Sequence, residues 1–183
     1  MKPLEEGVPS KVKKQVVKDL SHTYYPSKPL VPYIRATQDR VVLEIQRGCI
    51  RGCRFCQAGM IYRPIRPRDL EFLKQKALEM LENTGYEEIS LSSLSSSDYS
   101  HINELATRLT DELCDQRVSL SLPSLRADNF SMDLMQRLAK GRKTGLTFAP
   151  EAGTQRLRDV INKNVTLEDL LQSCRTAFAG GYS

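Results

Sequence analysis

From Arg40 onward, short apolar strands alternate with amphipathic helices along the chain. Strands are expected at 41–45, 88–91, 118–122 and 146–149, and helices at 67–83, 100–116, 131–141, 154–161 and from 166 onward. Such alternation is the signature of βαβ units and a parallel sheet. Right-handed crossovers curl such a sheet toward a barrel, with chemistry at the C-terminal ends of the strands. The sequence therefore predicts an α/β fold, a partial TIM-type (β/α) barrel of about four βα units.

Several helix boundaries in this pattern carry their own signals. Gly85 suits the C-terminal cap of the first long helix, because glycine adopts the left-handed conformation without penalty. Thr166 and Asp169 have the spacing of a capping box, with Asp in place of the usual Glu or Gln. Ser131 and Gly141 are expected to begin and end the helix after the third strand.

Residues 1–38 differ from the rest of the chain. Their apolar residues are poorly periodic, and prolines interrupt them at positions 3, 9, 26, 29 and 32. Because proline removes a backbone donor and fixes its own backbone, we expect an extended lead-in with at most a short helix near 12–20. The chain is therefore divided into a linker-like lead-in, residues 1–38, and a core, residues 39–183.

Three cysteines follow the first strand in a CxxxCxxC run, at Cys49, Cys53 and Cys56. Proteins that only pass electrons usually bind a 4Fe-4S cluster with four cysteines, and the bacterial ferredoxin run has two residues between its first two cysteines. A triplet with a longer first spacing and no nearby fourth cysteine suggests an iron left open to another ligand. We expect the loops at 93–98, 123–126 and 150–153 to face this triplet, because they also follow strands.

A structural zinc site is an alternative use of these cysteines, with a fourth ligand from Cys114, Cys174, His22 or His101. Zinc modules usually supply their ligands in two paired groups, which this spacing does not. Disulfides are less favoured, because the chain has an odd number of cysteines, five. Cys114 and Cys174 fall on the apolar sides of expected helices, so we expect them to be buried and without chemistry.

Composition is ordinary for a soluble protein, with 40% hydrophobic and 27% charged residues. No apolar run approaches the roughly 20 residues of a membrane helix, so we expect a cytoplasmic protein with no membrane partner. Six arginines lie in the stretch 47–68, which contains no Asp or Glu. This basic stretch could dock an acidic, low-potential electron donor of the flavodoxin or ferredoxin type, or bind a nucleic acid through its phosphates. A solvated basic loop without a specific partner is the alternative.

Four segments resemble the radical SAM superfamily: 47–64 around the cysteines, 91–100 (LSSLSSSDYS), 121–126 (SLPSLR) and 147–164 (TFAPEAGTQRLRDVINKN). The similarity is closest to a bacterial multidomain family in which a cobalamin-binding-like domain precedes the radical SAM core, and it extends to methylthiotransferases. The resemblance implies a 4Fe-4S cluster and S-adenosylmethionine (SAM) as cofactors. It also makes cobalamin a candidate, through a domain that is not in this chain.

The resemblance also implies roles for residues of the loop that carries the three cysteines, which we call the cysteine loop. Cys49, Cys53 and Cys56 would bind the cluster, and its open iron would chelate the amino and carboxylate groups of SAM. Phe55, just before the last cysteine, would lie beside the adenine. Gly59 would let the backbone approach closely.

Further cofactor contacts are implied after the second strand. Many relatives have a Gly-Gly-Glu there that binds the methionine amino group, whereas this chain has serines followed by an aspartate. Only a looser equivalence follows: oxygens of Ser96, Ser97 and Asp98 could accept hydrogen bonds from an ammonium.

The loops after the third and fourth strands supply the remaining candidates. Glu151 could accept hydrogen bonds from ribose hydroxyls or an ammonium, or instead compensate the N-terminal charge of the next helix. Ser124 and Arg126 could contact the cofactor carboxylate, or merely turn the chain out of the sheet. Residues 162–163 read as the end of a helix and a loop.

The expected function is that of a radical SAM enzyme core, which reductively cleaves SAM to a 5'-deoxyadenosyl radical that abstracts hydrogen from a substrate. Superfamily cores resemble a six-stranded partial barrel, whereas this sequence ends where a fifth strand would begin. It therefore resembles a core truncated at its C-terminus, which the remainder of the protein or another domain would cover. A catalytically incomplete fragment that binds only the cluster or SAM is one alternative, and a zinc-dependent nucleic-acid-binding module is another.

Overall fold

The centre of the molecule is a parallel sheet of three strands. The structure is a computed structural model that describes residues 4–129, 131, 134–136 and 145–182 of the 183-residue chain. Strand order in the sheet is β1 (Val41–Glu44), β4 (Glu88–Ser92) and β5 (Ser119–Ser121). A separate antiparallel pair joins β2 (Gln46–Arg47) to β3 (Arg66–Pro67). The α/β class predicted from the alternation is confirmed.

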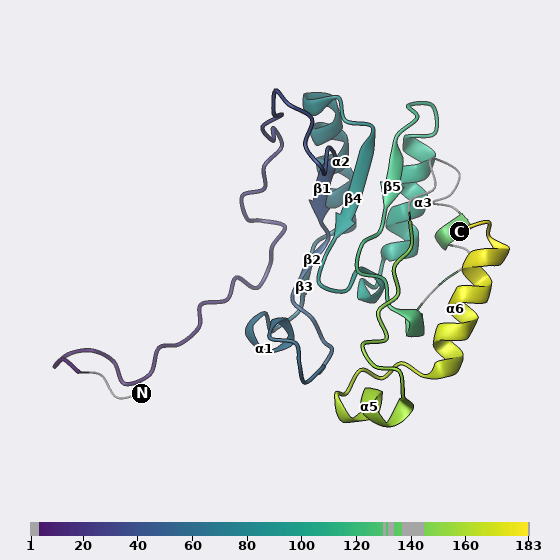
Figure 1. Ribbon diagram of the computed structural model, residues 1–183. Coiled ribbons are helices and arrows are strands. Elements are labelled where there is room, and N and C mark those ends of the chain that lie inside the picture. Colours follow the sequence, from purple (N-terminus) through teal and green to yellow (C-terminus); the bar gives the residue numbers. More distant parts are fainter. Residues whose placement is uncertain (1–3, 130, 132–133, 137–144, 183) are drawn as a thin grey trace.

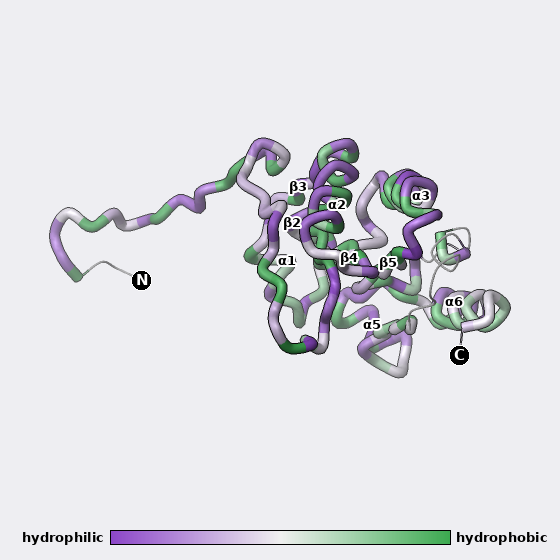
Figure 2. Tube along the Cα trace, turned by 90° about the horizontal axis from the view of Figure 1, so that it is seen from above, coloured by the Kyte–Doolittle hydropathy of each residue, from purple (hydrophilic) through white to green (hydrophobic). Residues whose placement is uncertain are grey.

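The longer helices connect the strands and follow them (Figure 1). Seen from above, α2 (Leu70–Thr84) and α3 (Ile102–Glu112) cover one face of the sheet (Figure 2). Further helical elements among the described residues include α1 (Ala58–Ile61) within the cysteine loop, the 3-10 turns η1 (Ser96–Asp98) and η2 (Ala127–Asn129), and the C-terminal helices α5 (Gln155–Val160) and α6 (Leu167–Ala179).

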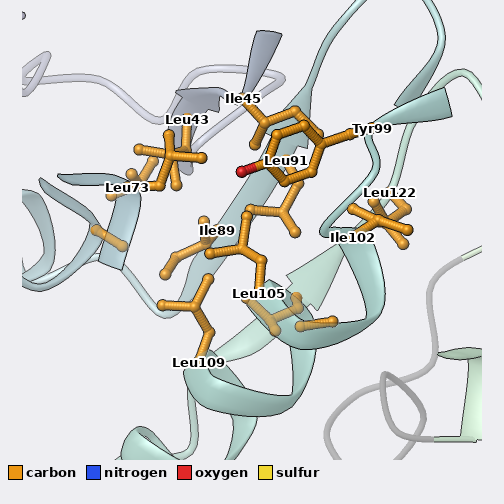
Figure 3. Close-up of a cluster of buried hydrophobic side chains, with 14 of the residues drawn as sticks. Leu43, Ile45, Leu73, Ile89, Leu91, Tyr99, Ile102, Leu105, Leu109 and Leu122 are labelled. Carbon is orange, nitrogen blue, oxygen red and sulfur yellow. The ribbon is translucent and has the colours of Figure 1, made fainter. Parts of the chain in front are cut away.

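Side-chain alternation along the strands gives the sheet one apolar face. Val41, Ile89 and Leu120 stand side by side in register, and each is almost completely buried. In Figure 3, Leu73 of α2 and Leu105 of α3 lie in the same cluster as the strand residues. Burying a leucine contributes about 2 kcal/mol. Because a one-residue slip would turn this row away from the helices, the core fixes the register and hence the level at which the strands end.

Capping residues define where α2 and α6 begin and end. Asp69 accepts a hydrogen bond from the backbone N–H of Phe72, so α2 begins at Leu70 rather than at Pro67, which pairs in β3. Gly85 ends α2 in the left-handed conformation, with φ of 69°, as predicted. The predicted capping box of Thr166 and Asp169 is also confirmed at the start of α6, with both reciprocal hydrogen bonds present.

The prediction of a fourth strand at 146–149 is wrong. These residues pair with no strand of the sheet, and none of residues 145–150 is fully buried. A strand of a parallel sheet normally has both faces covered, and here no face is covered completely. The sheet therefore contains three strands among the described residues. Of the helix predicted at 131–141, the structure describes only residues 131 and 134–136. The rest of that prediction, including its end at Gly141, lies outside the described residues.

The lead-in takes no helical or strand conformation over residues 4–38, so the short helix allowed near 12–20 is not formed. Its first part runs away from the body of the molecule (Figures 1 and 2). Several hydrogen bonds attach its second part: among them, the Tyr25 hydroxyl accepts from the Glu44 N–H at 2.7 Å, and Arg68 donates to the carbonyl of the buried Leu20 at 2.6 Å. The lead-in is therefore anchored where β1 ends.

Two cysteines outside the loop differ from the expectation of burial. Cys114 is exposed, because α3 ends at Glu112 before reaching it, and Cys174 is only half-buried. Within the described ranges, none of the helices combines the length and hydrophobicity that a membrane span requires.

Candidate functional site

The cysteine loop leaves the C-terminal end of β1 and returns through the β2–β3 pair (Figure 1). Cys49 and Cys53 are buried, Cys56 is half-buried, and none of them forms a disulfide. The backbone N–H of Cys56 donates to the Cys53 carbonyl at 3.0 Å, and that of Arg51 contacts the Cys49 sulfur at 3.4 Å. The loop thus holds three free thiols on a short, hydrogen-bonded stretch of backbone.

Two glycines are required by the way this loop folds on itself. Gly48 has φ of 102°, and a Cβ atom there would lie 2.4 Å from the Tyr62 carbonyl oxygen. A Cβ atom on Gly59 would lie 2.7 Å from the Arg51 carbonyl oxygen. Gly59 was predicted to allow close approach, and the close neighbour is the backbone of the same loop.

A cavity of about 350 Å³ lies between the ends of β1 and β4, bounded by Gly48, Tyr62 and Ser92 among others. Its volume falls within the roughly 300–1,000 Å³ of small-molecule sites. Gly48 connects the cavity to the loop, since it directly precedes Cys49. None of the residues predicted to contact SAM lines the cavity.

Acidic residues from other segments neutralise much of the basic stretch 47–68. Glu44 accepts hydrogen bonds from Arg47, at 2.8 and 2.9 Å, and from Arg68, at 2.8 Å. Burial alone would raise the pKa of Glu44, but the two guanidinium groups outweigh it and lower that pKa. The positive surroundings predicted for the cysteines are thus partly compensated, while the Arg54 side chain remains exposed and outside the ion pairs found among described residues.

The loop after β4 brings its predicted residues close to the cysteine loop but uses most of their hydrogen-bonding capacity internally. Ser96 is fully buried, and its hydroxyl donates to the Leu91 carbonyl at 3.0 Å. The Ser97 hydroxyl is buried without a hydrogen-bond partner among the described residues. Of these two serines, Ser97 is therefore the one with a free donor and acceptor.

Asp98 is held by the cysteine loop itself. Both carboxylate oxygens accept from the Arg51 guanidinium, Nε to Oδ2 at 2.8 Å, and the Ser95 hydroxyl donates to Oδ2 at 2.7 Å. Burial would raise the pKa of Asp98, but these hydrogen bonds lower it below its usual value. The carboxylate predicted to receive an ammonium is thus already paired with a guanidinium.

Arg126 and Ser124 take different positions in the loop after β5. Arg126 is buried and donates to both oxygens of Asp128, at 2.9 and 3.0 Å, and to the Lys163 carbonyl at 2.7 Å. Ser124 is exposed in a left-handed conformation, with φ of 62°. Arg126 therefore ties loops together, whereas Ser124 turns the chain.

Glu151 and Phe55 meet around one lysine. The Lys163 ammonium lies 3.2 Å from a Glu151 carboxylate oxygen and 5.9 Å from the centroid of the Phe55 ring. Glu151 is separated from Phe55 by almost a hundred residues of sequence, so the contact is tertiary. The structure thus brings together two residues that were predicted separately.

Three residues outside the predicted set hold the site together. The Asn162 side-chain amide donates to the Gly52 carbonyl at 2.8 Å, and the neighbouring Ile161 carbonyl accepts from the Arg54 N–H at 2.9 Å. Asn162 has φ of 55°, a conformation that asparagine tolerates at helix ends, so an Asn after a short helix was the available signal. Arg51 and Asp128 carried no signal, because their pairing depends on the tertiary structure.

The donors of the loop fit an iron–sulfur cluster, which proteins hold by cysteine thiolates on separate irons. All three thiols are free, and the loop leaves no room for a Cβ atom at Gly48 or Gly59. Among the described residues, no three Cys, His, Asp or Glu side chains converge on a position for a single metal ion.

Two proteins of Methanocaldococcus jannaschii are similar to most of this chain. The chain is 38% identical over 174 residues to the uncharacterized protein MJ0966 of Methanocaldococcus jannaschii, covering 90% of this chain and 37% of that protein. It is 23% identical over 170 residues to a second protein of that organism, named Putative methylthiotransferase MJ0865, covering 87% of this chain and 37% of that protein. The chain thus spans little more than a third of the length of these relatives.

The family comparison extends over most of the chain. Residues 43–183, from within β1 to the last residue, match the family described as Radical SAM superfamily. The matched region contains the cysteine loop, the parallel sheet that positions it, and the loops after β4 and β5 that contact it. The chain therefore belongs to the radical SAM superfamily.

Proposed function

We propose that this chain is the core of a radical SAM enzyme that binds a 4Fe-4S cluster through Cys49, Cys53 and Cys56. The observation that carries the proposal is the placement of three free thiols in one loop at the C-terminal end of β1. That edge is where parallel α/β folds gather their chemistry. Membership of the superfamily, whose members are generally enzymes, supports it.

The residues around the loop would orient SAM and exclude water. A cluster held by Cys49, Cys53 and Cys56 would supply the electron for reductive cleavage of SAM. Phe55 offers an aromatic face for the adenine and Glu151 a carboxylate for ribose hydroxyls, and the Lys163 ammonium lies near both side chains. Ser97 supplies the unpaired hydroxyl of the loop after β4.

We further propose an acidic electron donor of the flavodoxin or ferredoxin type as partner. The exposed Arg54, two residues from Cys56, supports this, because it adds positive charge beside the thiols. The name of the second relative, Putative methylthiotransferase, makes transfer of a methylthio group a candidate reaction for the whole protein.

Anaerobic reconstitution with iron and sulfide tests the proposal. We expect about four irons per chain and an electron paramagnetic resonance signal of the reduced protein that changes when SAM is added. Cys49→Ala, Cys53→Ala and Cys56→Ala should each lose the SAM-responsive signal, whereas Cys114→Ala should keep it because that thiol lies outside the loop. A SAM-responsive signal retained in the triple variant would refute the assignment of the ligands.

The alternatives give different outcomes in the same preparation. A catalytically incomplete fragment would show the SAM-responsive signal but release no 5'-deoxyadenosine. A zinc module would instead contain stoichiometric zinc, remain colourless and bind nucleic acid with a steep salt dependence. Measuring 5'-deoxyadenosine and metal content together therefore separates all three.

A further inference from the structure

The cysteine loop is tied to the loops after β4 and β5 by a chain of alternating charges. Arg51 lies between the first two cysteines and binds both oxygens of Asp98 in η1. Its remaining nitrogen, Nη1, reaches the Asp128 carboxylate in η2 at 3.2 Å. Asp128 in turn binds Arg126 through two hydrogen bonds. We call Arg51, Asp98, Asp128 and Arg126 the loop network.

This network is shielded from water, unlike an ordinary surface ion pair. The Asp98 and Arg126 side chains are 4% and 8% exposed, and those of Asp128 and Arg51 are 15% and 25% exposed. Exposed ion pairs contribute little to stability, but removing one member of a buried pair leaves its partner charged and unpaired, which is strongly destabilising. The two arginines and two aspartates also balance in charge. Removing one of them would therefore leave an uncompensated charge among the other three.

The network extends to the segment after α5. Arg126 donates to the Lys163 carbonyl at 2.7 Å, and the adjacent Asn162 donates to the Gly52 carbonyl of the cysteine loop. Segments after β1, β4, β5 and α5 are thereby connected through one set of contacts. Arg51 is the member within the cysteine loop, and its own N–H contacts the Cys49 sulfur.

We propose that Arg51 is a positioning residue, which holds the cysteine loop in its ligand-ready conformation before any metal arrives by pairing with Asp98 and Asp128. The proposal rests on the cluster-binding function proposed above. Its physical basis is preorganisation: a loop already fixed by the network loses less conformational entropy when it binds the cluster. Arginine suits the role because its planar fork binds a carboxylate through two bonds, which lysine cannot do.

Hydrogen exchange of the metal-free chain tests the network independently of cluster chemistry. In Arg51→Gln we expect the amides of residues 49–56 to exchange about tenfold faster or more, because the loop opens locally without its buried ion pair. Arg54→Gln is the matched control, since it removes an exposed arginine from the same loop, and should exchange like the wild type. Equal protection of 49–56 in Arg51→Gln and wild type would overturn the proposal.

Two further variants guard against misfolding. Asp128→Asn leaves the Arg51–Asp98 pair in place but weakens the Nη1 contact of Arg51 and the two hydrogen bonds from Arg126, so it should give a smaller increase in exchange at 49–56 than Arg51→Gln. Arg51→Lys keeps the charge but loses the fork, so it should restore protection only in part. Protection of 49–56 at the wild-type level in both variants would contradict a role for these contacts.

A spectroscopic readout distinguishes positioning from a general loss of stability. After reconstitution, the reduced cluster of Arg51→Gln should give a broadened or shifted paramagnetic signal, while Arg54→Gln should give the wild-type signal. An unchanged signal in a stably folded Arg51→Gln would argue that Arg51 is only structural. If the wild type binds no cluster, the proposed function fails, whereas the exchange result still decides whether the network orders the loop.

Discussion

At the residue scale, two kinds of position control the cysteine loop: glycines that permit close backbone contacts, and charged residues that depend on their partners. Gly48 combines a left-handed backbone with carbonyl oxygens on the side where a Cβ atom would stand. Asp98 is a buried carboxylate whose charge is stabilised by Arg51 and Ser95. Each gives a prediction with a distinct physical origin.

Gly48→Ala should destabilise the protein by about 2 kcal/mol or more, because the new Cβ atom would overlap the Tyr62 carbonyl in a strained backbone conformation. Gly85→Ala is the matched control: its φ is 69°, but nothing lies within 4 Å of the added Cβ atom. It should cost about 1 kcal/mol from backbone strain alone. Urea denaturation of both variants measures the difference, and equal losses would contradict the collision at Gly48.

Asp98→Asn should lower the free energy of unfolding at pH 7 by about 2 kcal/mol, since it removes charge-assisted hydrogen bonds. The pKa of Asp98 is lowered in the folded state from 3.8, despite burial that opposes this, by hydrogen bonds from Arg51 and Ser95. Its stabilising contribution is therefore full above pH 3.8 and is lost as the pH falls through the lower folded value. Denaturation from pH 7 to pH 3 should show the gap between wild type and variant narrowing at the acid end; a constant gap would contradict this.

At the element scale, helix caps and the apolar face of the sheet decide where the loops begin. α6 starts at a capping box, in which Thr166 and Asp169 satisfy each other's backbone N–H groups. α2 starts at Asp69 because Pro67 is occupied in the β2–β3 pair, which also closes the cysteine loop. The same pair therefore sets both a helix start and the loop size.

Thr166→Ala should cost about 1 kcal/mol of stability, the usual value for loss of an N-cap. Thr176→Ala in the same helix is the control, because its hydroxyl accepts only one long contact, 3.3 Å from Gln172. We expect it to change stability little. Thermal denaturation monitored by circular dichroism compares the two, and an equal loss in both would show that the cap is not responsible.

At the scale of the whole molecule, the site is assembled by contacts between distant segments. The Asn162 amide and the Gly52 carbonyl that it contacts are 110 residues apart. This hydrogen bond and the loop network attach the segment after α5 to the loop that leaves β1. The segment after α5 is therefore held against the loop that carries the cysteines, although the two segments are far apart in sequence.

Asn162→Gly should weaken this attachment without straining the backbone, because glycine accepts the φ of 55° found at this position. Asn162→Ala should lose the hydrogen bond and add backbone strain, so it should be less stable by about 1 kcal/mol than the glycine variant. Limited proteolysis of metal-free protein should then cleave near residues 150–164 faster in both variants than in the wild type. Wild-type cleavage rates in both would show that the contact does not hold the segment.

Much of this architecture was readable from local patterns. The strands at β1, β4 and β5, the left-handed Gly85 and the capping box of Thr166 follow from periodicity and from residues acting on their nearest neighbours. The predicted strand at 146–149 failed because alternation alone does not show whether a segment has neighbours to cover both faces. Burial of Cys114 failed for a related reason, since the helix ends before it.

The sequence by itself determined the α/β class, the cysteine loop after the first strand and its resemblance to the radical SAM superfamily, because these depend on spacing along the chain. Only the tertiary structure decided that Asp98 pairs with Arg51, that Arg126 binds Asp128, and that Lys163 lies near both Phe55 and Glu151. A charged side chain chooses its partner by distance in space and by burial. Neither quantity exists until the sheet has brought the loops to one edge.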